Sequence, residues 1–151
     1  MTRRHRAWAA ALTIVVAAWA CGLAVPDAAA QEGSKLEEIE TRLAEMSAQV
    51  EQSYTSGKVQ EALAVAEAAV TLAERELGPE HPDTATMLEN LAGLVQHVLR
   101  DPKRARPHYE RALAIREKAQ GPDHPETANV LYALAIVVEA SGDLRGARPL
   151  Y

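Results

Sequence analysis

The chain has 151 residues, of which 48% are hydrophobic and 25% are charged, and its formal net charge at pH 7 is −5. This length gives room for one domain, and the apolar fraction excludes an intrinsically disordered chain. Two Trp, four Tyr and no Phe leave few of the large residues that strands favour, so the composition indicates closely packed helices rather than a sheet.

The first 30 residues have the layout of a bacterial secretory signal peptide. Residues 1–6 are basic, residues 7–25 form an uncharged run, and the alanines at 28–30 fit an A-x-A cleavage site. The sequence therefore predicts export to the periplasm or the extracellular space, with a mature chain that begins at Gln31. Two alternatives stay open: the 19-residue run could remain as a membrane anchor, or Cys21 could be lipidated after cleavage.

The mature chain is acidic and lacks cysteine. Without residues 1–30 it keeps 13 basic and 20 acidic residues, a formal charge of −7, which excludes nucleic acid as a favoured partner. The only cysteine lies in the leader, so residues 31–151 have neither a disulfide nor a thiol nucleophile.

Two helices are predicted directly after the leader. Residues 31–34 read as a short polar passage, and from Leu36 to Tyr54 apolar residues recur at spacings of three and four, which is one stripe of a helix. A turn at residues 55–57 ends it. A second helix is expected at about 58–77, with Gly78 just past its end as a cap.

One stretch of sequence then occurs twice. GPEHPDTATMLENLA at residues 78–92 returns as GPDHPETANVLYALA at residues 121–135, with nine of fifteen positions identical. Glycine and the first proline end a helix, the second proline fits a first helical position that needs no N–H donor, and the acidic residues suit the next helix N-terminus. Each copy therefore ends one helix, turns the chain and begins the next helix, which is rich in leucine.

The repeat continues beyond these copies. ARPHYERALAIREKAQG at residues 105–121 is echoed by ARPLY at residues 147–151, which gives units of about 36–78, 79–121 and 122–151, the last incomplete. Units of this length bury their apolar faces only against neighbouring units. The pattern predicts an all-α solenoid of antiparallel helix pairs that is truncated within the third unit.

These motifs resemble the tetratricopeptide repeat (TPR) of the long, kinesin-light-chain-like type. The most specific part is GPDHPETA with its leucine-rich helix, together with ERALAIREK, and the resemblance covers about residues 36–151. It implies a right-handed superhelix that binds peptide segments in a concave groove, with no catalytic residues and no cofactor. When the family's groove positions are transferred to the matching repeat positions of this sequence, the groove residues are Glu89, Asn90, Gly93, Gln96, His97, Tyr132, Ala133, Ile136 and Glu139. Such a groove should prefer a peptide with apolar and basic character.

The residues that could carry chemistry read as structural. His81 and His124 occupy one repeat slot, and helix axes 8 to 10 Å apart keep such slots too distant to share a metal, so we expect both side chains to bond to backbone at the corners. The serines have no neighbouring histidine and acid, and no glycine-rich phosphate loop occurs. We therefore predict a protein that is not an enzyme and holds no metal.

Residues 97–118 are rich in Lys and Arg. They form either a solvated outer helix face or a binding site for an acidic partner. One candidate for that partner is the acidic first helix of another copy of this chain. The candidate residues for this basic patch are Arg100, Lys103, Arg104 and Arg106.

The sequence thus predicts an exported scaffold that binds a protein or peptide partner, with a membrane contact only through residues 1–30. One alternative is the recognition arm of a larger enzyme or signalling protein, because arrays of this family are often joined to such domains. The other is self-association through the uncapped C-terminal end of the array.

Overall fold

The computed structural model describes residues 28–150, all of them in helices or the short connections between them, without a β-strand in that range. In chain order the elements are α2 (Ala28–Thr55), α3 (Val59–Glu76), α4 (Pro82–His97), α5 (Pro102–Gln120), α6 (Pro125–Ala140), α7 (Leu144–Ala147) and the 3₁₀ helix η1 (Arg148–Leu150). The predicted all-α class is confirmed.

The start of α2 corrects one expectation. The polar passage predicted at residues 31–34 is helical, because a lone glycine such as Gly33 costs a helix only about 1 kcal/mol. A boundary between two compact units of the chain falls inside this helix, after Leu36. The predicted signal or anchor lies almost wholly at residues 1–27, outside the described residues, and in residues 28–150 no helix is apolar enough over a sufficient length to span a membrane.

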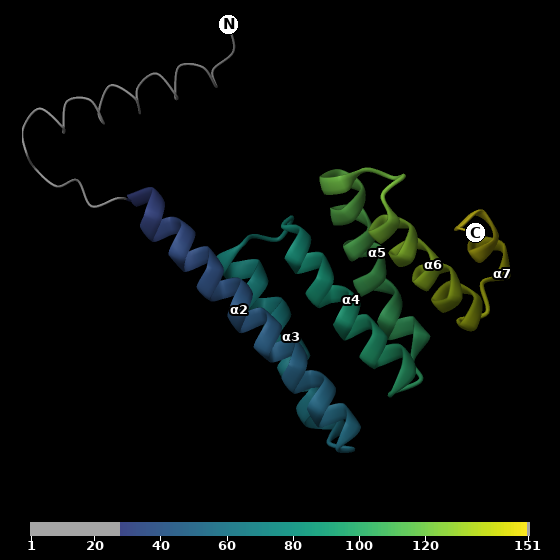
Figure 1. Ribbon diagram of the computed structural model, residues 1–151. Coiled ribbons are helices and arrows are strands. Elements are labelled where there is room, and N and C mark those ends of the chain that lie inside the picture. The colour runs from purple at the N-terminus through teal and green to yellow at the C-terminus, as the bar shows by residue number, and fades with distance from the viewer. Residues whose placement is uncertain (1–27, 151) are drawn as a thin grey trace, which may run out of the picture. The chain divides into compact units, whose positions relative to one another are not determined.

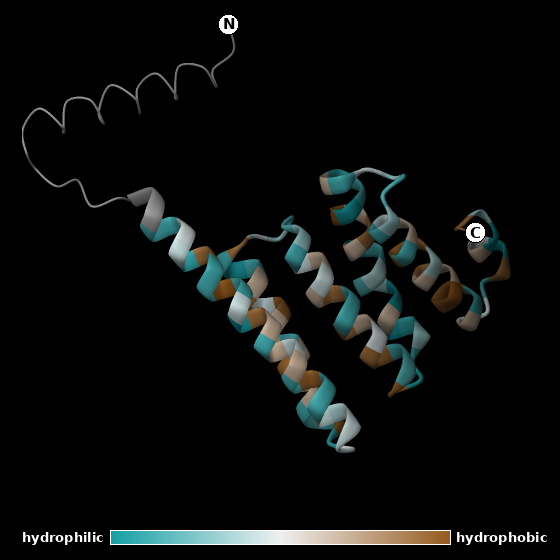
Figure 2. Ribbon diagram, viewed as in Figure 1, coloured by the Kyte–Doolittle hydropathy of each residue, from teal (hydrophilic) through white to brown (hydrophobic). Residues whose placement is uncertain are grey.

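In the unit that begins at Glu37, α3 packs against α4, α4 against α5, α5 against α6 and α6 against α7 (Figure 1). Alanines pack where helices meet: Ala62, Ala73, Ala92 and Ala112 have no exposed surface. Figure 2 shows apolar and polar residues interleaved along each helix rather than gathered in separate helices. The predicted leucine stripes lie in this core, with Leu88, Leu91 and Leu134 at most 4% exposed. The solenoid of helix pairs predicted from the repeats is confirmed.

The first corner between units is built as expected. Gly78 has φ +103°, and Pro82 is the first residue of α4. His81 caps this helix, since its Nδ1 accepts a hydrogen bond from the Asp83 N–H at 3.2 Å. A feature that the sequence reading missed is Thr84, whose buried hydroxyl donates to the Gly78 carbonyl at 2.8 Å and fastens the corner.

The second corner repeats this arrangement residue for residue. Gly121 has φ +91°, and His124 Nδ1 accepts from the Glu126 N–H at 3.2 Å. The hydroxyl of Thr127 donates to the Gly121 carbonyl at 2.9 Å. Both histidines are therefore structural caps, as predicted.

The turns inside the units share a backbone conformation but not a residue type. Gly57 and Gly142 have φ +74° and +91°, and the middle unit places Arg100 in the same slot with φ +53°. The left-handed region costs a residue with a side chain free energy that glycine does not lose. Arg100 is the strained member of this set.

Candidate peptide-binding face

The first helix of each unit presents one set of slots. An offset of 43 residues relates Asn90 on α4 to Ala133 on α6, and the amide of Asn90 lies 3.5 Å from the hydroxyl oxygen of Ser47 on α2. These positions lie beside the fully packed ones: Tyr54 is 48% exposed, and Tyr132, next to Ala133, is 60% exposed. We call this surface of α2, α4 and α6 the first-helix face.

Two hollows open on this face between α2 and α4. The larger has a volume of about 490 Å³ and is lined by Ser47, Val50, Glu51, Tyr54, Glu89, Asn90, Gly93, Leu94, His97 and Val98. The smaller, of about 350 Å³, is lined by Glu40, Leu43, Ala44, Ser47, Asp83, Thr86 and Met87. The larger volume lies within the range of about 300 to 1,000 Å³ that is usual for ligand sites.

The predicted groove residues fall into two groups. Four of those on α4 line the larger hollow, namely Glu89, Asn90, Gly93 and His97. Gln96 is half-buried on the same helix, and the four predicted on α6 lie one unit further along, where Tyr132 and Glu139 are exposed and Ala133 and Ile136 are half-buried.

The sequence reading missed the contribution of α2. Ser47, Val50, Glu51 and Tyr54 line the larger hollow opposite α4. The repeat gives no signal for them, because α2 does not follow the 43-residue offset: the buried Leu88, Leu91, Ala92 and Val95 of α4 correspond at that offset to exposed residues of α2.

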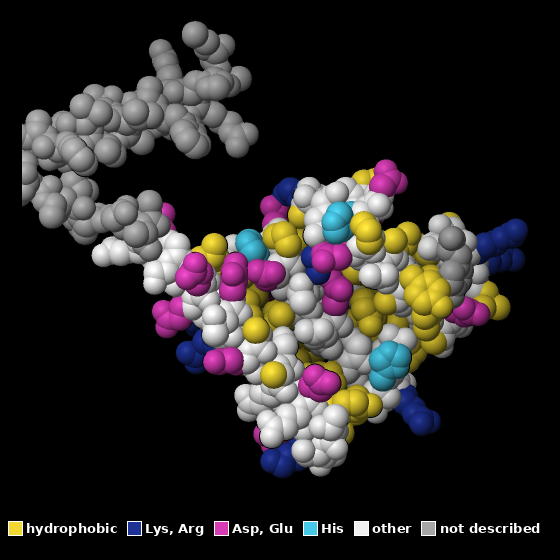
Figure 3. All heavy atoms as spheres, in the orientation of Figure 1, with side chains coloured by type: hydrophobic (Ala, Val, Ile, Leu, Met, Phe, Trp, Pro, Cys, Tyr) yellow, Lys and Arg dark blue, Asp and Glu magenta, His cyan; other side chains and the backbone are white. Residues whose placement is uncertain are grey.

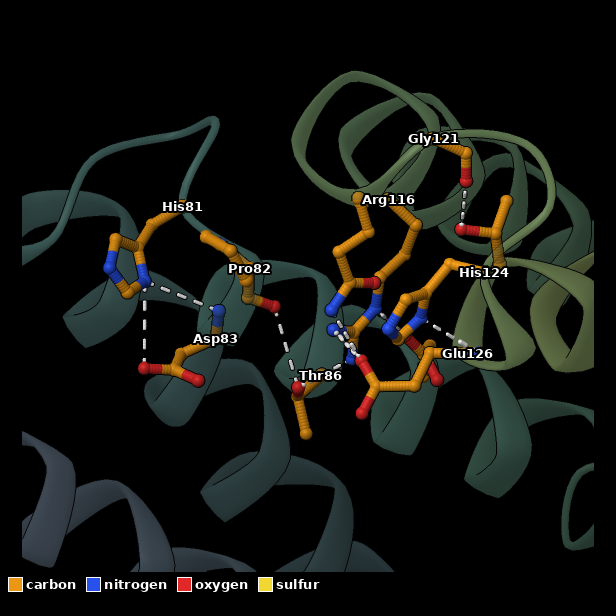
Figure 4. A network of polar contacts seen from close by, with 11 residues as sticks. His81, Pro82, Asp83, Thr86, Arg116, Gly121, His124 and Glu126 are labelled. Carbon is orange, nitrogen blue, oxygen red and sulfur yellow. Dashed lines mark hydrogen bonds and ion pairs between the residues drawn. The ribbon is translucent and has the colours of Figure 1, made fainter.

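Glu89 is not a free carboxylate. Arg116, 6% exposed on α5, donates from Nε to Glu89 Oε1 at 2.9 Å, from Nη1 to Glu126 Oε2 at 2.6 Å and from Nη2 to the hydroxyl of Thr86 at 2.8 Å (Figure 4). The guanidinium thus joins α4, α5 and the start of α6. It holds Glu89 in place and supplies a counter-charge for it.

The two carboxylates of this network are affected in opposite directions. Burial raises the pKa of Glu89 above its usual value, and the hydrogen bonds and charge of Arg116 oppose that shift. The pKa of Glu126 is lowered, first by the hydrogen bond that the Gln120 amide donates at 2.8 Å and then by the charge of Arg116.

The basic stretch at residues 97–118 is less uniform than predicted. Arg116 is buried rather than solvated, because its three hydrogen bonds compensate for lost hydration. Arg106, part of the predicted patch, pairs with Glu110 at 2.6 Å and with Asp143 at 3.7 Å. Arg111 pairs with Glu74 and Lys118 with Glu80. The rest of the patch, Arg100, Lys103 and Arg104, is exposed.

Comparison with known proteins agrees with this architecture. Residues 53–83 and 85–151 match models of the tetratricopeptide repeat. The chain belongs to the tetratricopeptide-repeat family. Its TPR units are of the kinesin-light-chain-like type, since it is similar to a putative kinesin light chain from Podosopora anserina with nearly identical TPR-like repeats, at 28% identity and a TM-score of 0.65 over 72% of this chain and 51% of that one.

A second solved structure shows the same fold. BtubC (BKLC) from P. vanneervenii is 21% identical, with a TM-score of 0.67 over 74% of this chain and 44% of that one. The TPR chain thus spans about half the length of these solved relatives. A comparison of this sequence with curated proteins found no match.

In the part of the TPR chain that the structure describes, no group of three or more His, Cys, Asp or Glu side chains is placed to hold a metal ion. The polar groups that converge on the face are a carboxylate paired with Arg116, an amide, an imidazole and hydroxyls. Such a set suits hydrogen bonding and apolar contact with a peptide.

Proposed function

We propose that this TPR chain is a non-catalytic interaction module that holds a peptide segment of a protein partner on its first-helix face. The observation that carries the proposal is the pair of hollows between α2 and α4, the larger of which is lined by the exposed ring of Tyr54. TPR units generally bind protein or peptide partners. The stacked units give such a segment rigid contacts at a fixed spacing.

We further propose that the module is exported by residues 1–30, with a membrane anchor as the alternative. The basic start, the uncharged run and the three alanines support export. Mass spectrometry of the chain expressed in a bacterium with its own N-terminus should find a mature start at Gln31. An intact N-terminus in the membrane fraction would favour the anchor.

Binding can be tested with peptides selected from a random display library on the full chain. The double variant Tyr132→Ala, Ile136→Ser should weaken the selected peptides about tenfold, because it removes apolar contact from the α6 part of the face. Ala114→Ser, at an exposed position on α5, is the control and should bind as the original chain does. Equal affinities for both variants would exclude the α6 part of the face as the site.

A further inference from the structure

One slot on the first-helix face is filled differently on α4 and α6. The 43-residue offset aligns Gly93 on α4 with Ile136 on α6. The residue on α6 carries a branched apolar side chain, whereas the residue on α4 has no side chain. Gly93 also lines the larger hollow.

The backbone does not require glycine at this position. Gly93 lies inside α4 and is absent from the residues with positive φ. A Cβ built on it would meet only the Tyr109 hydroxyl, at 3.7 Å, which is an ordinary contact. Glycine inside a helix lowers stability relative to alanine. A residue that costs stability and relieves neither strain nor a clash is best explained by the hollow it leaves open.

Much of the wall of the hollow is apolar, with Val50, Leu94 and Val98 beside the ring of Tyr54. An apolar side chain that enters it from water is stabilised in proportion to the area it buries. The hollow therefore fits a large aliphatic or aromatic side chain.

The charge around the hollow has one sign. Neither hollow between α2 and α4 is lined by a Lys or an Arg, whereas Glu40, Glu51, Asp83 and Glu89 line them. Arg116 pairs with Glu89, whereas Glu40 and Glu51 are exposed. In Figure 3 acidic and hydrophobic side chains share the middle of this face, and most Lys and Arg lie at its edges.

We propose that the hollow over Gly93 is an anchor pocket that takes one large apolar side chain of a basic partner segment, whose Lys or Arg residues lie against Glu51 and Glu40. This inference rests on the proposed function and specifies the partner's chemistry. An acidic segment, such as the N-terminal helix of a second copy, would meet like charge here.

The test fills the pocket without disturbing the fold. Gly93→Leu places a side chain in the hollow, and the melting temperature should not fall, because leucine is the better helix former. Gly33→Leu is the matched control: it is the same change inside helix α2, at a position where an added Cβ meets nothing within 4 Å. Circular dichroism should show both variants folded.

The probes are dye-labelled nonapeptides with a central Leu, Phe or Trp between pairs of Lys, measured by fluorescence anisotropy on the full chain. One matched set carries Glu in place of Lys, and another carries Ala at the centre. The original chain and Gly33→Leu should bind the basic, anchored set about tenfold or more tightly than either matched set. Gly93→Leu should lose that preference, and raised salt should weaken the basic set.

Three results would overturn the inference: unchanged binding by Gly93→Leu, tighter binding of the Glu set, or no preference for the basic, anchored set in the original chain. The double variant at Tyr132 and Ile136 separates this failure from failure of the proposed function. If library-selected peptides are weakened by the double variant but not by Gly93→Leu, the face binds peptides and the anchor pocket is wrong. If neither change weakens them, both proposals fall.

Discussion

The two junctions between units share the same helix-capping corner but differ in the side chains that pack beneath it. At the first junction a hollow of about 350 Å³ is lined in part by Asp83, and at the second a hydrogen-bonded charged set lies under the corner (Figure 4). Under the 43-residue offset Ala73 and Asp83 at the first junction correspond to Arg116 and Glu126 at the second. Hydrogen bonds to the backbone hold both corners in the same way, so the side chains beneath them can differ.

The second junction can hold a buried arginine because its partners are present. A buried guanidinium is stable only when carboxylates and hydroxyls replace its lost water. Arg116 has three such partners, while the alanine in its slot at the first junction, Ala73, packs with no exposed surface. The alanine slot needs no polar partner, whereas the arginine slot does.

The largest effect is expected from breaking the charged set. Arg116→Ala leaves Glu89 half-buried without its counter-charge and should lower the free energy of unfolding by about 2 to 3 kcal/mol. Urea denaturation measures the loss. The control is Lys118→Ala, on the same helix as Arg116, which breaks an exposed pair with Glu80 and should cost less than about 0.5 kcal/mol. Equal losses in both variants would mean that burial of the network does not matter.

The same comparison predicts a rescue. The triple variant Thr86→Leu, Glu89→Met, Arg116→Ala replaces the charged set at the second junction with apolar residues. It should recover most of the stability lost by Arg116→Ala, because apolar residues often replace a buried ion pair at no cost. A triple variant as unstable as the single one would show that the second junction does not accept an apolar filling.

The shared part of the corners should respond equally in both copies. Thr84→Val and Thr127→Val each remove one buried hydrogen bond to a glycine carbonyl while keeping the shape, and each should cost about 1.5 kcal/mol in urea denaturation. Thr71→Val on the exposed face of α3 removes a bond within its own helix and should cost less than about 0.5 kcal/mol. A large difference between the two corner variants would show that the filling beneath affects the cap.

The turns inside the units offer a gain in stability. Arg100→Gly relieves a left-handed backbone at a slot where the other units have glycine, and it should raise stability by about 1 kcal/mol. The reverse change, Gly142→Arg, should lower it by a similar amount. Thermal unfolding of both variants measures the pair. If Arg100→Gly loses stability instead, the arginine makes contacts worth more than the strain.

The fold could be predicted from the sequence because the residues that specify it lie close together in the chain. Gly78, Pro82 and His81 act within a few residues of one another, and the helix stripes repeat at fixed spacing. The network around Arg116 could not be predicted, because it joins residues 10 to 30 positions apart. Nothing in the sequence distinguishes this buried arginine from its solvated neighbours on α5. The hollow over Gly93 could not be predicted for a related reason: it exists only because residues of α2 lie opposite α4.

The smallest expected effect is a pH dependence confined to the second junction. The pKa of Glu126 is lowered by Gln120 and Arg116, so its carboxylate stabilises the fold above about pH 4.5, and this contribution is lost as the pH falls through the folded pKa. Glu126→Gln should therefore be less stable than the original chain near pH 7, and the gap should close on acidification. Asp83→Asn makes the same change at the first junction, where no arginine lies beneath, and isolates effects common to both corners. Urea denaturation between pH 3 and 7 follows both variants, and a gap for Glu126→Gln that stays constant with pH would contradict the role assigned to its carboxylate.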